Sequence, residues 1–320
     1  CNKNTSIYIL WKKIKRERRK IMKNKIISIL SNAAKFNENI EMEKINRIKN
    51  IKKDVVTKAD MEIGNFIINS FLKDNLKILI ESEEYGKQRN FENSTEDYYI
   101  VIDDIDGSNN LRVGKGLLPY CSMIVIFQSS NNKKYKFSDY KYAACIEYTS
   151  KKIFYTEKGL GTVEIYDING RKIMDSIHNV QDNYKLALTL STDILSSTRG
   201  GKVGYSELND IYISEKPSEL DAVYKKYATV DSGCSVFEYA MVGMKIRNGY
   251  VSKGKKMHEL PLLYAFSKEN GQEMCDFSGN SYDSIEYEFS ATDKEVVSGN
   301  KEIVKDICKL IDSQRKFDNT

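Results

Sequence analysis

The chain has 320 residues, of which 41% are hydrophobic, so it can bury a sizeable core as one large domain or two smaller ones. No apolar stretch approaches the roughly 20 residues that a membrane-spanning helix needs. The six cysteines are widely spaced and form no CxxC pair, which favours reduced thiols and a cytoplasmic protein. With only His178 and His258, a His-rich zinc site or a Ser-His-Asp triad is difficult to assemble.

The net charge of +5 is concentrated near the start of the chain. Residues 1–21 carry eight Lys or Arg and one acidic residue, whereas the rest of the chain has 42 basic and 44 acidic side chains. The basic run at residues 12–20 has the composition of a nucleic-acid or acidic-lipid contact, but a solvated extension is the simpler interpretation. We therefore expect a disordered basic extension at 1–21 and a single domain at 22–320, with sub-lobes of about 22–184 and 185–320. We expect no nucleic-acid or membrane partner.

In the first half of the chain, helices come before strands. Apolar residues at mixed three- and four-residue spacing predict an amphipathic helix from Ile26 to roughly Lys49, and a second helix follows Asp60. Apolar runs predict strands at 76–80, 98–102, 121–127 and 142–148. Two turn signals between residues 151 and 173 favour a β-meander.

In the second half, strands and helices alternate more regularly. Strands are predicted at 185–190, 249–254 and 272–277, and helices from Ser218, over 234–246, over 258–271 and over 302–313. Pro261 is tolerated in the first turn of its helix, and Gly271 suits the C-terminal cap. These patterns predict an α+β protein with helices and sheets in layers.

Carboxylates follow two of the apolar strands. Glu83 and Glu84 come after the strand at 76–80, and Asp103, Asp104 and Asp106 end the strand at 98–102. Three like charges within four residues repel one another and resist burial, unless a cation lies among them. If the two strands are neighbours, their ends converge, and the oxygen ligands gathered there suit Mg²⁺. A surface turn rich in Asp, Gly and Asn is the simpler alternative.

Several ordered stretches resemble signatures of the inositol monophosphatase family of Mg²⁺-dependent, lithium-sensitive phosphatases. This group includes fructose-1,6-bisphosphatases and 3'(2'),5'-bisphosphate nucleotidases. DDIDGSNN (103–110) resembles the family's DPxDG(S/T)xN motif. Similar matches are VVTKAD (55–60) to a VTxxD stretch, ESEEYG (81–86) to a GEE loop, SGCSVFEYAMVG (232–243) to a glycine-led helix, and residues 249–279 to a GYxxxxxxxWDxAAG region. The resemblance covers about residues 22–279 and implies the family's layered αβαβα sandwich.

The resemblance also implies a role for each matching position. Glu83, Asp103 and the Ile105 carbonyl match ligands of a first metal ion, and Asp103, Asp106 and Glu259 match ligands of a second. The implied cofactor is Mg²⁺, with two or three ions per site. Thr57, Asp60 and Ser108 match the groups that orient and deprotonate the attacking water. The implied substrate contacts are Glu83, Ile105, Asp106, Gly107, Ser108, Asn109, Gly233, Cys234, Ser235, Ser252 and Glu259.

Three positions depart from the family pattern. His258-Glu259 replaces Trp-Asp, which lengthens one ligand by a methylene and raises the alternative of an inactive site. We expect His258 to pack in place of the Trp rather than to bind metal. Asp104 replaces a proline, and we expect it to point to solvent; the alternative is that it enlarges the acidic field and tightens metal binding. Ser252 stands where inositol-specific members carry Glu, and the nearby Lys253, Lys255 and Lys256 are candidates for binding a second phosphate.

We therefore expect a Mg²⁺-dependent phosphomonoesterase that hydrolyses a small sugar, inositol or nucleotide phosphate and releases inorganic phosphate. Fructose-1,6-bisphosphatase or bisphosphate nucleotidase activity is one alternative. A catalytically degenerate relative that binds phosphate or metal is another. The resemblance also implies a homodimer whose partner is a small phosphorylated metabolite.

Overall fold

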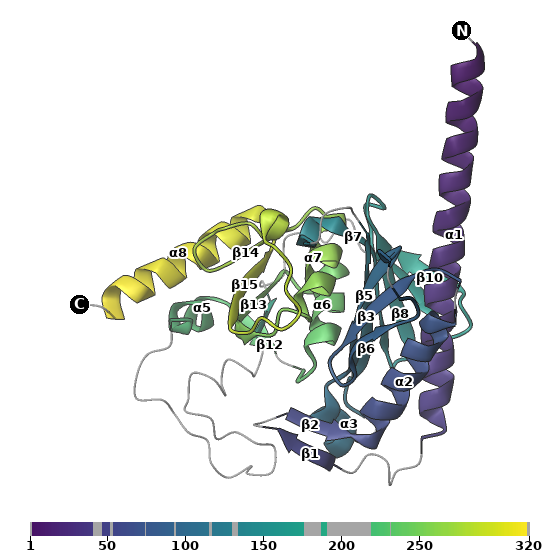
Figure 1. Ribbon diagram of the computed structural model, residues 1–320. Coiled ribbons are helices and arrows are strands. Elements are labelled where there is room, and N and C mark those ends of the chain that lie inside the picture. Colours follow the sequence, from purple (N-terminus) through teal and green to yellow (C-terminus); the bar gives the residue numbers. More distant parts are fainter. Residues whose placement is uncertain are drawn as a thin grey trace.

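The computed structural model describes residues 2–40, 47–51, 54–73, 75–92, 94–114, 117–129, 134–175, 187–190, 219–230 and 232–318. Its elements form five layers, with two sheets separating three layers of helices (Figure 1). The outer helices α1 (Asn2–Glu38) and α2 (Lys58–Leu72) cover one face of the larger sheet. Helices α6 (Ser235–Gly243) and α7 (Leu260–Glu269) lie between the sheets, and α5 (Asp221–Lys226) and α8 (Lys301–Asp318) cover the smaller one. The predicted αβαβα sandwich is confirmed.

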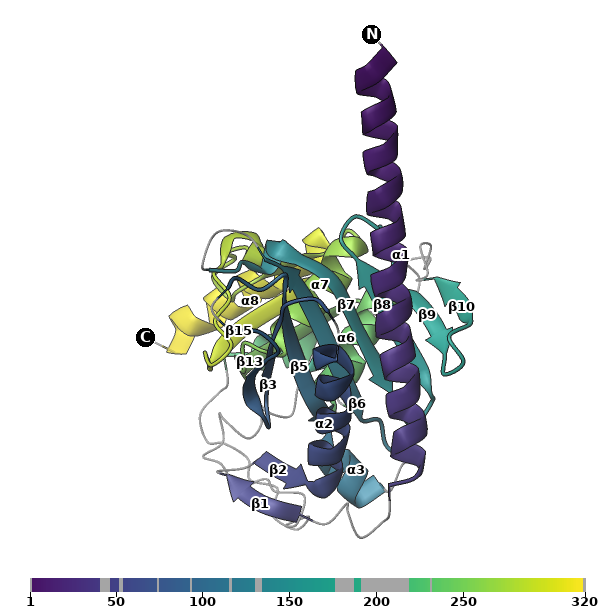
Figure 2. The same ribbon diagram turned by 45° about the vertical axis from the view of Figure 1, so that its right-hand side comes forward.

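The larger sheet has eight strands in the order β10-β9-β8-β7-β6-β5-β3-β4. Strands β3 and β5 pair in parallel, and their neighbours pair antiparallel. The carboxyl ends of β3 and β5 therefore lie at the same edge of the sheet (Figure 2). The strands are β3 (Ile78–Ser82), β4 (Gly86–Arg89), β5 (Tyr98–Asp106), β6 (Cys121–Gln128), β7 (Tyr140–Glu147), β8 (Lys152–Glu157), β9 (Glu164–Asp167) and β10 (Lys172–Asp175).

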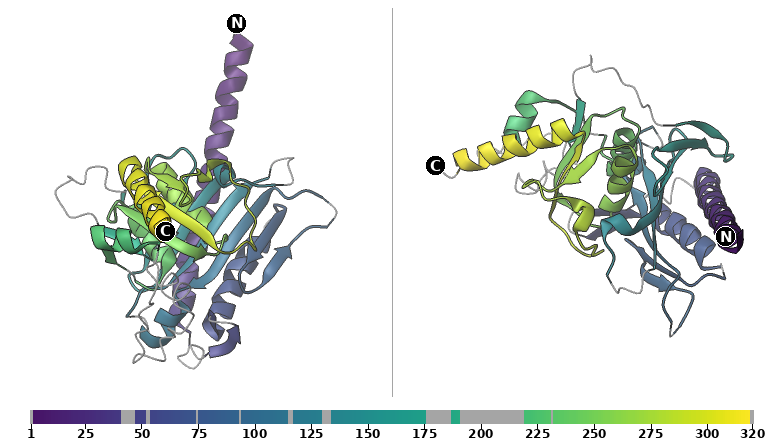
Figure 3. Two further views of the ribbon diagram at one scale, coloured as in Figure 1. Left: turned by 90° about the vertical axis from the view of Figure 1, so that its left-hand side faces the viewer. Right: turned by 90° about the horizontal axis from the view of Figure 1, so that it is seen from above.

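The smaller sheet has five strands in the order β12-β11-β13-β15-β14. Strand β11 pairs in parallel with β12 and β13, whereas β15 pairs antiparallel with β13 and β14. Figure 3 shows this sheet between the α6–α7 layer and α8. Its strands are β11 (Ala187–Leu190), β12 (Ala228–Val230), β13 (Gly249–Lys255), β14 (Glu273–Cys275) and β15 (Lys294–Gly299).

Three short elements and a hairpin complete the described chain. Strands β1 (Arg47–Ile51) and β2 (Asp54–Thr57) form an antiparallel hairpin. The short elements are α3 (Ser108–Gly114) and the 3-10 turns η2 (Phe137–Asp139) and η3 (Tyr282–Ser284). The predicted boundary between sub-lobes near residue 184, and the predicted helix start at Ser218, lie outside the described residues.

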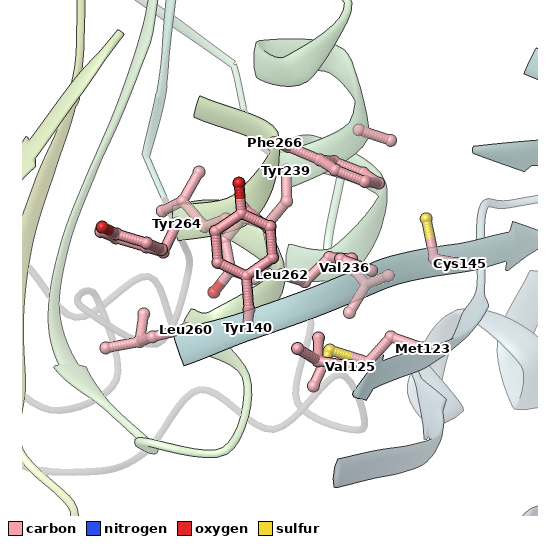
Figure 4. Packing of buried hydrophobic residues seen from close by; sticks show 14 of the residues in the cluster. Met123, Val125, Tyr140, Cys145, Val236, Tyr239, Leu260, Leu262, Tyr264 and Phe266 are labelled. Atoms are coloured by element: carbon pink, nitrogen blue, oxygen red, sulfur yellow. The ribbon is translucent and has the colours of Figure 1, made fainter. Parts of the chain in front are cut away.

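Strand β5 is buried on both faces, which explains its uninterrupted apolar sequence. Tyr99 and Val101 join the core between the larger sheet and α6–α7, whereas Ile100 and Ile102 join the core against α1 and α2. The first of these cores is shown in Figure 4, which labels Met123, Val125, Tyr140, Cys145, Val236, Tyr239, Leu260, Leu262, Tyr264 and Phe266. The site-bearing strand is thus fixed from both sides.

Helix α1 differs from the sequence prediction at both ends. It begins at Asn2, so residues 2–21, which we expected to be disordered, are helical, and this part extends beyond the body of the molecule (Figure 1). It ends at Glu38 and not near Lys49, because residues 47–51 belong to the β1–β2 hairpin. Among the described residues, no helix combines the length and the apolar character needed to cross a bilayer.

Candidate functional site

The parallel pairing of β3 and β5 brings the predicted carboxylates together. Ser82 lies opposite Ile102, and the backbone N–H of Glu83 donates to the Ile102 carbonyl at 3.3 Å. Glu83 and Asp103 are therefore neighbours at the strand ends. Together with His258, they offer three ligand atoms that all lie within 4.8 Å of one another.

The donor set fits a divalent cation. The Asp103 side chain is buried, and its Oδ1 has no hydrogen-bond partner within the described part of the chain; the same holds for His258 Nε2. Burial and the nearby Glu83 raise the pKa of Asp103. Burial acts in the same direction on Glu83, but His258 and Lys256 outweigh it and hold the pKa of Glu83 well below its ordinary value. A cation among these groups would satisfy the orphaned atoms and relieve the repulsion.

Thr57, Asp60 and Ser108 form a hydrogen-bonded chain beside these carboxylates. Thr57 caps helix α2, with its Oγ1 accepting from Asp60 N at 3.3 Å and its N–H donating to Asp60 Oδ2 at 2.9 Å. The hydroxyls of Thr57 and Ser108 both donate to Asp60, and Ser108 Oγ also lies 2.9 Å from the Ile105 carbonyl oxygen. Burial raises the pKa of Asp60 despite these bonds, which makes it a better proton acceptor.

The turn after β5 must be made by glycine. Gly107 has φ of +86°, and a Cβ there would lie 3.1 Å from both Cys234 Cβ and the Pro119 carbonyl oxygen. Ser108 and Asn109 follow it and are half-buried. Asn110, which was not among the predicted site residues, donates from Nδ2 to Ser232 O at 2.6 Å and to Pro119 O at 2.8 Å. Its place in the DDIDGSNN motif was the signal that could have identified it.

Asp106 and Glu259, two of the three carboxylates predicted for a second metal ion, already accept hydrogen bonds from the protein. Asp106 Oδ2 accepts from Val236 N at 2.6 Å and from Cys234 Sγ at 3.1 Å. Burial and Glu259 raise the pKa of Asp106 to about 6. Glu259 Oε2 accepts from Lys255 Nζ at 3.0 Å and lies 3.4 Å from the Tyr239 hydroxyl.

The predicted substrate residues outside the β5 turn are largely enclosed. Cys234 and Ser235 are buried at the start of α6, directly after Gly233. Ser252 on β13 is fully buried, and its hydroxyl has no partner among the residues described.

The three lysines expected near a second phosphate each hold a carboxylate instead. Lys253 pairs with Glu219, Lys255 with Glu259, and Lys256 Nζ donates to Glu83 Oε1 at 2.7 Å.

The prediction that Asp104 points to solvent is wrong. Its side chain is fully buried against helix α2, where a Cβ on Gly64 would come within 2.1 Å of its Oδ1. Asp104 Oδ2 accepts from Ser82 Oγ at 2.6 Å and from Glu84 N at 3.0 Å. Successive residues of a strand face opposite sides, so Asp103 and Asp104 diverge.

His258 packs as expected, but its ring nitrogen is also one of the clustered ligand atoms. Its ring stacks on Phe289, with centroids 5.0 Å apart and planes at 22°. Its Nε2 lies 3.6 Å from Glu83 Oε2, within the ligand cluster. Only the packing role was expected from the sequence.

No family model matches the chain, and no curated protein matches it in sequence. Its structure is similar to that of an IMPase of Thermotoga maritima, at 19% identity and a TM-score of 0.61 over 91% of this chain and 97% of that one. It is similar to the extragenic suppressor protein suhB of Bartonella henselae, at 14% identity and a TM-score of 0.63 over 90% and 97%. A protein of Pyrococcus horikoshii with similarities for inositol-1 monophosphatase gives 20% identity and a TM-score of 0.62 over 92% and 98%. The chain therefore has the inositol monophosphatase fold.

Proposed function

We propose that the chain is a Mg²⁺-dependent phosphomonoesterase that hydrolyses a small phosphorylated metabolite and releases inorganic phosphate. One observation carries this proposal. The hydrogen-bonded chain of Thr57, Asp60 and Ser108 reaches the Ile105 carbonyl, two residues along β5 from Asp103 in the ligand cluster of Glu83, Asp103 and His258. A proton acceptor and a cation site side by side are what hydrolysis by an activated water needs.

Each group of residues has a distinct task in this proposal. Glu83, Asp103 and His258 would hold the cation, with the Ile105 carbonyl as a further ligand, and the cation would lower the pKa of a bound water and neutralise phosphate charge. Asp60 takes a proton from the attacking water, and Thr57 and Ser108 hold its carboxylate in position. The backbone N–H groups of residues 107–109 would bind phosphate oxygens.

The proposed substrate is a phosphate ester of a sugar, an inositol or a nucleotide. One similar structure is that of SaIMPase-II with bound inositol monophosphate, at 11% identity, and another is that of an inositol monophosphatase-fructose 1,6 bisphosphatase, at 21%. Lys253, Lys255 and Lys256 each hold a carboxylate, so they give no support for a bisphosphate over a monophosphate. The homodimer and the cytoplasmic location remain predictions.

A catalytically inactive relative that binds metal or phosphate is the second candidate. The ion pair of Lys256 with Glu83 favours it, because it places one of the chain's own cations on a predicted metal ligand. The Lys256 side chain is 34% exposed, however, so it can move into solvent when a divalent ion competes for Glu83.

Phosphate release with and without Mg²⁺ tests the proposal on inositol 1-phosphate, fructose 1,6-bisphosphate and adenosine 3',5'-bisphosphate. We expect Mg²⁺-dependent turnover of at least one, and a loss of about 10²- to 10⁴-fold in kcat in Asp60→Asn. The matched control is Asp283→Asn, because Asp283 is an exposed carboxylate on η3 that pairs with Lys268. Equal rates in Asp60→Asn and wild type would contradict the assignment. Silence on all three substrates, with Mg²⁺ bound in calorimetry, would favour the second candidate.

A further inference from the structure

Lys255 places a buried ammonium group among the residues that the resemblance assigns to a second metal ion. Its side chain is 1% exposed. Nζ donates to Glu259 Oε2 at 3.0 Å and to Ser235 Oγ at 2.5 Å. Its charge also acts on Asp106, whose pKa it lowers against the larger effect of burial. One fixed positive charge thus faces both carboxylates.

An irregularity in β13 directs Lys255 into the site. The strand pairs regularly with β15 from Gly249 to Ser252, and the register then shifts before Lys255 pairs with Lys294. Within this stretch Gly254 has φ of +80°, a conformation that glycine adopts without strain. Such bulges change the direction of a side chain. The backbone conformation at Gly254 therefore determines that Lys255 points inward.

The ammonium and a divalent ion would compete for the same space. Asp106 Oδ2 already accepts from Val236 N and Cys234 Sγ, and Glu259 Oε2 already accepts from Lys255. A divalent ion bound between Asp106 and Glu259 would also be repelled by the adjacent ammonium at low dielectric. Conversely, a buried ammonium is stable only when carboxylates and hydrogen-bond acceptors surround it, as they do here.

The other half of the site has the opposite character. Glu83, Asp103 and His258 contribute the described ligand atoms that converge within 4.8 Å, and both Asp103 Oδ1 and His258 Nε2 lack hydrogen-bond partners in the described chain. Both side chains are more than nine-tenths buried. This half therefore has ligand atoms without partners, to which a cation can bind. In the half around Lys255, the ammonium is already the cation that the carboxylates hold.

We propose that the Lys255 ammonium takes the place of the second metal ion, so that the site binds a single divalent ion through Glu83, Asp103 and His258. The proposal deepens the proposed function and rests on it only for the role of the site in hydrolysis. The imidazole ligand makes the site suited to Mn²⁺ as well as to Mg²⁺, which allows the bound ions to be counted.

Titration of the metal-free full chain with Mn²⁺ tests the proposal, with free Mn²⁺ measured by electron paramagnetic resonance. We expect one tightly bound ion per wild-type chain, none in Asp103→Asn and two in Lys255→Met. The matched control is Lys253→Met, which removes a lysine from the same strand that pairs with Glu219 and should leave the count at one. Two tightly bound ions in wild type, or one in a folded Lys255→Met, would overturn the proposal.

A second variant covers the case in which Lys255→Met fails to fold. Glu259→Gln should still bind one ion, because Glu259 holds the ammonium and not the metal; loss of that ion would overturn the proposal. The count is independent of phosphate release. A one-ion protein that hydrolyses nothing would contradict only the proposed function, and a two-ion wild type that hydrolyses a substrate would contradict only the single-ion site.

Discussion

At the scale of single residues, the buried Asp104 carboxyl makes the stability of the fold depend on pH. Burial, opposed by hydrogen bonds from Ser82 and Glu84, raises the pKa of Asp104 to about 7. The unfolded carboxyl titrates near its ordinary pKa of roughly 4. The folded state therefore favours the protonated form, and this stabilisation is lost as the pH rises from about 4 through about 7.

Asp104→Asn should remove this pH dependence. Asparagine keeps an acceptor for Ser82 and Glu84 but carries no charge. Relative to wild type, the metal-free variant should gain about 2–3 kcal/mol of unfolding free energy between pH 5 and pH 8. Urea unfolding at the two pH values measures the gain. An equal difference between variant and wild type at both values would show that Asp104 is not protonated in the fold.

The sequence identifies site residues where a motif and an element end coincide. Asp60 in the first turn of α2, and Glu83 and Asp103 at strand ends, could be predicted in this way. The orientation of Asp104 could not, because no solvent-facing side exists on a strand covered by helices on both faces. The inward turn of Lys255 could not be predicted either, since it depends on the bulge at Gly254.

At the scale of elements, the contact of α6 with α7 depends on Gly243. A Cβ there would lie 2.8 Å from Phe266 Cβ and 3.1 Å from Phe266 Cγ. Asn270 Nδ2 also donates to the Gly243 carbonyl, so α6 has little freedom to move away. The two helices therefore approach each other closely at this glycine.

Gly243→Ala should destabilise the protein by about 1–3 kcal/mol, because overpacking outweighs the helix preference of alanine. Chemical denaturation measures the change. Lys305→Ala is a suitable control, since Lys305 is exposed on α8 and its truncation creates no clash. A Gly243→Ala variant as stable as wild type would mean that α6 and α7 separate at small cost.

Long apolar strands were predicted more accurately than short or polar ones. Strands β5, β6 and β7 are apolar because helices cover both sheet faces, so composition alone identifies them. The edge strand β4 (GKQR) and the hairpin strand β1 (RIKNI) lack such a run, and neither was predicted. The hairpin also explains the wrong end of the first helix, since charged residues near Lys49 continue a helix-like spacing.

At the scale of the whole molecule, the layer order was available only through the resemblance. Periodicity gives the faces of each element but not the strand order, because β5 pairs in parallel with β3 and not with β4, which precedes it in the chain. The fold then places residues from both halves of the chain in one site, with Glu83 and Asp103 on one side and His258 and Glu259 on the other.

Helix α1 supports this assembly only along part of its length. Among its described side chains, burial begins at Met22, whereas Ile14 is 45% exposed and Ile21 is 66% exposed. Beyond that point Ile26 and Leu30 lie in the core against the larger sheet, and Lys23 Nζ donates to Glu164 at 2.6 Å. The helix thus has a projecting part and a structural part.

Deleting residues 1–16 should therefore leave the midpoint of thermal unfolding unchanged, whereas deleting residues 1–30 should prevent folding. The longer deletion removes Met22, Ile26, Ile27, Ile29 and Leu30, all of them buried. Each such side chain contributes about 1.5–3 kcal/mol, so their sum reaches the whole stability of a typical protein, about 5–15 kcal/mol. Calorimetry and circular dichroism of the two truncations distinguish the parts. If the shorter deletion lowered the midpoint substantially, the projecting part would have to pack on the protein or on a second copy, and the basic run at residues 12–20 would then lie in that contact.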